Sequence, residues 1–198
     1  MSEQVIVEAD RRTEIVNAAA LIIHRRGYDA TSMNEIAEAV NLTKAGLYYY
    51  TRGKQDLLYM IIKWAMDLVE KDILTPCREI MDPEERIRAI VKNHLEVMMV
   101  DGGAVTILTV EVDKLPTEKR SEINQRHRIY LNLVKNTLAE LKDLGRLRTT
   151  DPMIAALNMF ATFFGVPRWY QQEGHLDQDD VSEEINNYVL GALLNDRE

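Results

Sequence analysis

Residues 31–50 read TSMNEIAEAVNLTKAGLYYY, and this stretch decides the fold. Thr31 and Ser32 can each cap a helix start, and Ser32 with Glu35 has the S-x-x-E spacing of a capping box. Asn41 tolerates a left-handed turn, and Thr43 can cap a second helix of about two turns. The stretch therefore predicts two short helices joined by a tight turn, which is the outline of a helix-turn-helix.

The second short helix, residues 44–50, has two different faces. At 100° per residue, Leu47 and Tyr50 fall on one side, where they would pack on the first short helix. The other side points outward and carries Lys44, Ala45, Tyr48 and Tyr49. An outward polar and aromatic face on the second helix is what a major groove receives, so we expect DNA contact there rather than a packed aromatic run.

The charge of the chain is acidic overall but not at this helix. The sequence has 24 Lys and Arg against 32 Asp and Glu, a net charge of −8, which by itself counts against a nucleic-acid partner. Residues 1–54 are neutral, however, and the run from Lys44 to Lys54 contains three basic residues and no acidic one. That run suits a phosphate-facing edge, although Lys44 and Lys54 could also be ordinary solvated lysines.

The rest of the chain shows helical spacing of apolar residues almost throughout. Gly27 and Gly145 are expected to cap helices at their C-terminal ends, and Asp82-Pro83 and Asp151-Pro152 to open them. With breaks at Pro76, Gly102-Gly103 and Pro167, we expect about nine helices and no strands, the longer ones covering about 55–74, 83–101, 104–112, 117–144, 152–166 and 181–192.

Several function classes are disfavoured. Cys77 has no partner for an intramolecular disulfide, and the start of the chain resembles no leader, so we expect a cytoplasmic protein. The most apolar window, residues 104–112, is too short to span a membrane. We see no phosphate loop, nucleophile elbow or metal-ligand spacing, and expect neither an enzyme nor a cofactor. His94 and His127 lie on apolar stripes and read as core residues, with a metal site shared with Glu111 as the alternative.

These residues resemble a known family. The run Thr31 to Ala37, then Val40, then Leu42 to Tyr50, followed by Lys54 and Leu57-Leu58, is similar to the N-terminal domain of TetR-family transcriptional regulators. The resemblance covers roughly the first 60 residues. It implies an all-α homodimer with a three-helix DNA-binding domain, here residues 1–54, and a ligand-binding and dimerisation domain, here residues 55–198.

The resemblance also implies DNA contacts at particular positions. Bases or backbone would be contacted by Lys44, Ala45, Gly46, Tyr48 and Tyr49, and phosphates would be positioned by Thr31, Ser32, Thr43 and Lys54. The chain departs from the family pattern at Tyr49, where the family often has His, and at Thr51, where it usually has Phe. The second departure is expected to weaken local packing.

A fainter resemblance concerns the effector. The run Pro167 to Tyr170, then Gly174 and Leu176, together with Arg128 and Tyr130, is similar to TetR-family members that sense acyl-CoA thioesters. The expected ligand-binding residues are His94, Met98, Met99, Leu108, Arg126, Arg128, Tyr130, Phe160 and Phe163. Met and aromatic side chains suit an acyl chain, and Arg126 or Arg128 could meet CoA phosphates. Phe160 and Phe163 could instead belong to the core or to a dimer interface, and the arginines to the surface.

The expected function is a ligand-responsive repressor. A homodimer would place two recognition helices about 34–36 Å apart on a near-palindromic operator in double-stranded DNA. An apolar effector such as an acyl-CoA would tilt the helix from Gln55 to about Leu74 and lower operator affinity. The alternatives are a regulator of this family that senses a drug or an aromatic compound, and an all-α carrier or enzyme that binds no DNA.

Overall fold

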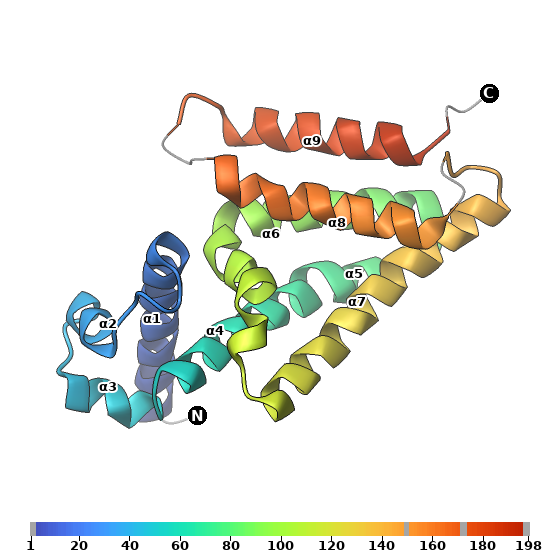
Figure 1. Ribbon diagram of the computed structural model, residues 1–198. Helices are drawn as coiled ribbons and strands as arrows, with labels where there is room; N and C mark the ends of the chain where they lie inside the picture. Colours follow the sequence, from blue (N-terminus) through green and yellow to red (C-terminus); the bar gives the residue numbers. More distant parts are fainter. Residues whose placement is uncertain (1–2, 149–150, 171–173, 196–198) are drawn as a thin grey trace. The chain divides into compact units, whose positions relative to one another are not determined.

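A computed structural model describes residues 3–148, 151–170 and 174–195 (Figure 1). Most of this backbone is helical, and its one β feature is an isolated bridge between Leu147 and Leu194, so the all-α prediction is confirmed. The α-helices are α1 Glu3–Arg26, α2 Met33–Ala39, α3 Lys44–Tyr50, α4 Lys54–Leu68, α5 Thr75–Arg78, α6 Pro83–Val110, α7 Thr117–Asp143, α8 Pro152–Trp169 and α9 Gln178–Leu193. A π-helix, η1 Val69–Leu74, and a 3₁₀ turn, η2 Val112–Lys114, complete the described elements.

The predicted caps set the ends of the first three helices. The Ser32 hydroxyl accepts a hydrogen bond from the backbone N–H of Glu35 at 3.2 Å, which starts α2. Thr43 accepts one from the backbone N–H of Gly46 at 3.0 Å, which starts α3. Gly27 ends α1 with a φ of +82°, a conformation that side chains other than glycine rarely adopt.

The predicted break at Gly102-Gly103 is wrong. α6 runs from Pro83 to Val110 through both glycines, so the segment 104–112 is not a separate helix. Glycine lowers helix propensity by about 1 kcal/mol relative to alanine, but it keeps its backbone N–H and can continue the hydrogen-bond ladder. The described residues contain nine α-helices, which is the expected number. The short α5, which the sequence does not predict, takes the place of the separate helix expected over 104–112.

Pro76 does not end the helical run as predicted, because other groups satisfy the backbone around it. The chain continues through η1 into α5, and Pro76 lies in the first turn of α5. Proline cannot donate to the carbonyl four residues earlier. That carbonyl belongs to Asp72, and it accepts a hydrogen bond from Asn93 Nδ2 at 3.0 Å. The Glu70 carbonyl accepts the Thr75 hydroxyl at 2.8 Å in the same turn.

Pro167 likewise fails to stop its helix at once. α8 continues to Trp169, and the backbone N–H of Tyr170 still donates to the Val166 carbonyl at 2.9 Å. A proline in the last turn removes one hydrogen bond but leaves the later donors in place. No helix in the described ranges has the length and apolar content needed to cross a bilayer.

Contacts divide the chain into two compact units that do not follow the order of the sequence. The first unit contains residues 1–66 and 103–123, and the second contains residues 67–102 and 124–198. Helices α4, α6 and α7 therefore each contribute residues to both units. The functional boundary after residue 54 stays a prediction.

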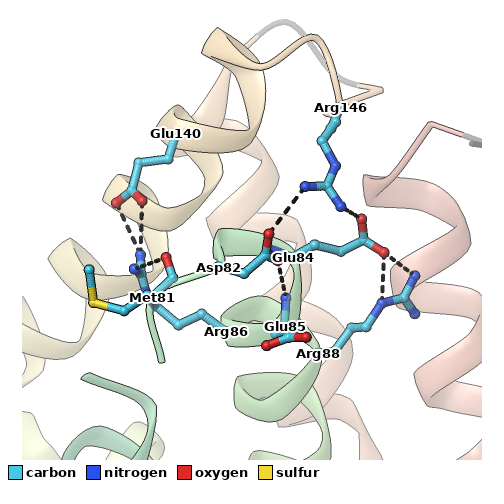
Figure 2. A network of polar contacts seen from close by, with 8 residues as sticks. All are labelled: Met81, Asp82, Glu84, Glu85, Arg86, Arg88, Glu140 and Arg146. Atoms are coloured by element: carbon cyan, nitrogen blue, oxygen red, sulfur yellow. Dashed lines mark hydrogen bonds and ion pairs between the residues drawn. The ribbon is translucent and has the colours of Figure 1, made fainter. Parts of the chain in front are cut away.

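A polar network connects the start of α6 to other parts of the second unit (Figure 2). The Glu84 carboxylate is buried, and it pairs with Arg88 at 2.7 Å and with Arg146. Arg86 pairs with Glu140 of α7 at 3.0 Å. A buried carboxylate needs such partners, because an unpaired charge away from water is costly. The network therefore ties the start of α6 to α7 and to the loop that follows α7.

Candidate functional site

Helix α3 presents the outward face that its sequence predicts. The Leu47 side chain is fully buried, whereas Tyr48 and Tyr49 are 47% and 72% exposed. Lys44 and Ala45 are exposed as well. The buried Leu47 and the exposed pair therefore divide α3 into an inward and an outward face.

The turn before α3 holds that face in position. Asn41 adopts a φ of +53°, the left-handed conformation expected of it. The backbone N–H of Leu42 donates to the Ala37 carbonyl at 2.8 Å, and Arg11 donates to the Val40 carbonyl at 2.5 Å. These bonds link α1, α2 and the turn. The helix-turn-helix is thus rigidly connected to the helix before it.

The side chains of two predicted phosphate ligands, Thr31 and Lys54, contact other parts of the protein. The Thr31 hydroxyl is buried and donates to the Gly27 carbonyl at 2.9 Å. Lys54 Nζ lies 4.4 Å from the centre of the Tyr28 ring and donates to the Asp29 carbonyl at 3.2 Å. Their side chains therefore hold the loop between α1 and α2. Ser32 and Thr43 are exposed and cap their helices, and Gly46 is half-buried against Thr43.

Thr51 is buried and takes part in a hydrogen-bonded turn. Its hydroxyl lies 3.0 Å from the Gly53 carbonyl and 3.2 Å from Asp56 Oδ2, and Asp56 also accepts the backbone N–H of Arg52 at 3.0 Å. A polar turn thus stands before α4, where the family usually has Phe, and the weaker local packing stays a prediction.

A basic groove that the sequence reading missed lies at this same turn. It has a volume of about 460 Å³ and is lined by residues 52–56 together with Tyr59, Pro116 and Lys119. Arg52 is exposed, and Lys119 lies over the Tyr59 ring at 3.8 Å. The run from Lys44 to Lys54 could have indicated Arg52. Nothing in the sequence places Lys119 beside Arg52, because the two residues are far apart along the chain and come together only in the folded structure.

The predicted effector residues of the second unit form an aromatic cluster around His94. The His94 ring stacks on Phe163 with a centroid distance of 4.4 Å, and its Nδ1 lies 2.7 Å from the Tyr130 hydroxyl. Phe160 meets the Tyr130 ring edge-on at 5.1 Å. Met98 is buried one helical turn after His94. The structure therefore gathers five of the nine predicted ligand residues within α6, α7 and α8.

The other predicted ligand residues lie in different settings. Met99 is buried against Val166 and Val181. Leu108 is buried in the first unit. Arg126 pairs with Asp67 at 2.8 Å, whereas Arg128 is exposed.

Burial controls the charge state of the cluster. Burial lowers the pKa of His94 to about 3 and raises the pKa of Tyr130 well above its usual value, so both side chains are neutral near pH 7. The pKa of His127 is also lowered, by burial and by the neighbouring Arg126. The described residues include no group of three or more His, Cys, Asp or Glu side chains placed to hold a metal ion.

Part of the fainter resemblance falls outside the described residues. Positions 171–173 are not described, and neither is the side chain of Arg168. Trp169 is half-exposed and meets the Tyr170 ring edge-on at 6.5 Å.

Comparison with protein families gives two matches that together cover most of the chain. Residues 15–59 match a family described as bacterial regulatory proteins of the tetR family. Residues 81–193 match a family described as the C-terminal domain of tetracyclin repressor-like proteins.

Individual relatives agree with these matches. The transcriptional repressor KstR2 of Rhodococcus jostii is 27% identical, over 94% of this chain and 92% of that protein. The transcriptional activator FasR of Mycolicibacterium smegmatis is 29% identical, over 93% of this chain and 83% of that protein. A crystal structure of AibR in complex with isovaleryl coenzyme A and operator DNA is similar with a TM-score of 0.81 and 30% identity, over 90% of this chain and 97% of that one.

Proposed function

The chain belongs to the TetR family of bacterial transcriptional regulators, and from this premise we propose that it is a dimeric repressor released from its operator by an acyl-CoA thioester. It is a DNA-binding regulator and not an enzyme. We place it in the cytoplasm, where operator DNA is accessible.

The observation that carries the DNA-binding proposal is the split of α3 into a buried and an exposed face. Tyr48 and Tyr49 are exposed beside Lys44 on the outward face of this short helix. We assign base or backbone contacts to Lys44, Ala45, Gly46, Tyr48 and Tyr49. We assign phosphate contacts to Ser32, Thr43 and the start of α4, where Arg52 joins Lys54 in the basic groove.

Dimerisation is assigned to α8 and α9. Helix α8 exposes Ile154 and Leu157 one turn apart, and Tyr188 on α9 is 71% exposed. A groove of about 520 Å³ runs between the two helices, which lie side by side in Figure 1. Exposed apolar side chains on two neighbouring helices support the assignment of this surface to a second subunit.

The effector is assigned to the aromatic cluster of the second unit. Its neutral, apolar character suits an acyl chain, and the AibR complex holds an acyl-CoA together with operator DNA. Residues 1–54 would read DNA and residues 55–198 would bind the effector and the second subunit. A sensor of planar aromatic compounds is the second candidate, because stacked rings such as His94 and Phe163 also accept flat ligands.

Operator binding tests the first part of the proposal. Lys44→Ala and Tyr49→Ala should each weaken binding to the DNA upstream of the protein's own gene by about 1–3 kcal/mol. Lys44→Ala should also lower the slope of affinity against salt, because it removes a phosphate contact. Fluorescence anisotropy at several KCl concentrations measures both effects.

The matched control is Lys142→Ala, which removes an exposed lysine from α7. Its operator affinity and salt slope should equal those of the wild type. If Lys44→Ala and Tyr49→Ala also bind like the wild type, α3 is not the recognition helix.

A ligand screen by thermal shift tests the second part. Acyl-CoA thioesters should raise the melting temperature and lower operator affinity, since a ligand that binds the folded state stabilises it. Free acids and cationic drugs should do neither. A rise with aromatic drugs alone would favour the second candidate.

A further inference from the structure

One buried polar atom in the aromatic cluster lacks a hydrogen bond. His94 is only 2% exposed, and its Nε2 atom has no hydrogen-bond partner among the described residues. Buried polar groups in native proteins are nearly always paired, and each exception calls for a physical explanation. A ligand that supplies the missing partner is one such explanation.

The other ring nitrogen decides what Nε2 can offer. Nδ1 lies 2.7 Å from the Tyr130 hydroxyl, and the ring is neutral because burial excludes the charged form. If Tyr130 donates to Nδ1, the imidazole hydrogen lies on Nε2 and one donor is left unpaired. If Nδ1 instead donates to Tyr130, the phenol hydrogen and Nε2 are both left without partners. The first arrangement leaves fewer unpaired groups, so Nε2 carries a hydrogen and is a donor.

The surroundings restrict which acceptor can approach. The ring stacks on Phe163 and meets Phe160 at 6.0 Å and Phe164 at 6.2 Å, and no Lys or Arg takes part in these contacts. A carboxylate would lose its hydration there without gaining an opposite charge. A neutral carbonyl oxygen on an apolar chain meets no such penalty. The site therefore favours a thioester over the corresponding free acid.

We propose that His94 is the polar anchor of the effector site and donates Nε2–H to the thioester carbonyl oxygen of a bound acyl-CoA. Tyr130 is a positioning residue, because its hydroxyl holds the imidazole in the donating tautomer. This inference rests on the proposed acyl-CoA effector and specifies which of its atoms the protein recognises.

The test compares thioesters with thioethers that lack the carbonyl oxygen. The probes are isovaleryl-CoA and palmitoyl-CoA, each with its S-alkyl analogue, titrated into the full-length protein by calorimetry. The wild type should bind at least one thioester about tenfold more tightly than its thioether, the value of one hydrogen bond to a buried donor. This comparison needs no substitution and does not depend on the folding of a variant.

The variants His94→Phe and Tyr130→Phe test whether these two residues cause the preference for the thioester. His94→Phe should bind thioester and thioether equally, with the affinity that the wild type has for the thioether. It exchanges one unpaired donor, His94 Nε2–H, for another, the Tyr130 hydroxyl, and keeps the ring stack, so its melting temperature without ligand should stay close to that of the wild type. Tyr130→Phe should keep part of the preference. Operator affinity in the absence of ligand serves as the folding control for both variants.

The outcomes separate the two proposals. If neither thioester binds the wild type, the proposed acyl-CoA effector is wrong, and so is the proposed role of His94 as its anchor. If thioesters bind but thioethers bind equally well, or if His94→Phe keeps the preference, the effector stands and the anchor is overturned.

Discussion

At the residue scale, His94 makes the stability of the protein depend on pH. Its pKa is about 3 in the folded protein and near 6.5 in the unfolded chain, so the unfolded chain takes up a proton first as the pH falls. Stability is therefore fully present above pH 6.5 and is lost between pH 6.5 and 3. The slope is about 1.4 kcal/mol per pH unit, which gives a loss of about 2 kcal/mol by pH 5.

Urea unfolding at pH 7 and at pH 5 measures this loss, and His94→Phe is the control. Tyr130 faces His94, and Cys77 lies behind Tyr130. Both side chains stay neutral between pH 7 and pH 5 because the pKa of each is raised. The variant should lose less stability than the wild type by about 2 kcal/mol. Equal losses in the two proteins would contradict a neutral buried His94.

The exposed face of α3 could be predicted at this scale, whereas the roles of Thr31 and Lys54 could not. The faces follow from 100° per residue and one buried leucine, both of which are local. The partners of Lys54 are Tyr28 and a carbonyl of Asp29, which lie 25 residues away or more. Asp29 in turn pairs with Lys114, 85 residues later. Local spacing contains no information about such contacts.

At the element scale, the helical run through Pro76 depends on Asn93. Asn93→Ala leaves the Asp72 carbonyl without its donor and should cost about 1–3 kcal/mol. Pro76→Ala restores a backbone N–H in the same turn, so Asn93→Ala should cost less in that background. Chemical denaturation of the four proteins in this double-mutant cycle measures the coupling. An equal cost in both backgrounds would show that Asn93 does not compensate for the proline.

Helix starts were predicted better than helix interruptions, for a physical reason. Ser32, Thr43 and Asp151 act through bonds within three residues, and each caps its helix as expected. Gly102-Gly103 and Pro76 only lower local helix stability, by an amount that tertiary contacts can offset. The side chain of Asn93 is such a contact, and it comes from another helix.

At the scale of the whole molecule, dimer formation should depend on the exposed apolar face of α8. Leu157→Glu places a charge on a half-exposed position, so the folding stability of the subunit should change by less than about 0.5 kcal/mol. The same charge would be buried in a subunit interface, where it should prevent association. Light scattering should then report a monomer, and operator affinity should fall because two linked half-sites are no longer engaged together.

Met81→Glu provides the comparison for this test. Met81 is 85% exposed and lies outside α8 and α9. Its variant should have the mass and operator affinity of the wild type. A dimeric Leu157→Glu protein would place the interface elsewhere.

The first unit is built from two segments that are distant in the sequence, residues 1–66 and 103–123, and this has a practical consequence for engineering. The backbone N–H of Tyr28 donates to Glu111, and Gln55 donates to the Lys114 carbonyl, so residues 103–123 help to hold the loop between α1 and α2 and the start of α4. A chimera that grafts only residues 1–54 onto a foreign sensor would leave this support behind. A transplant that carries residues 1–66 and 103–123 as one block, with the joins placed inside α4, α6 and α7, would keep it.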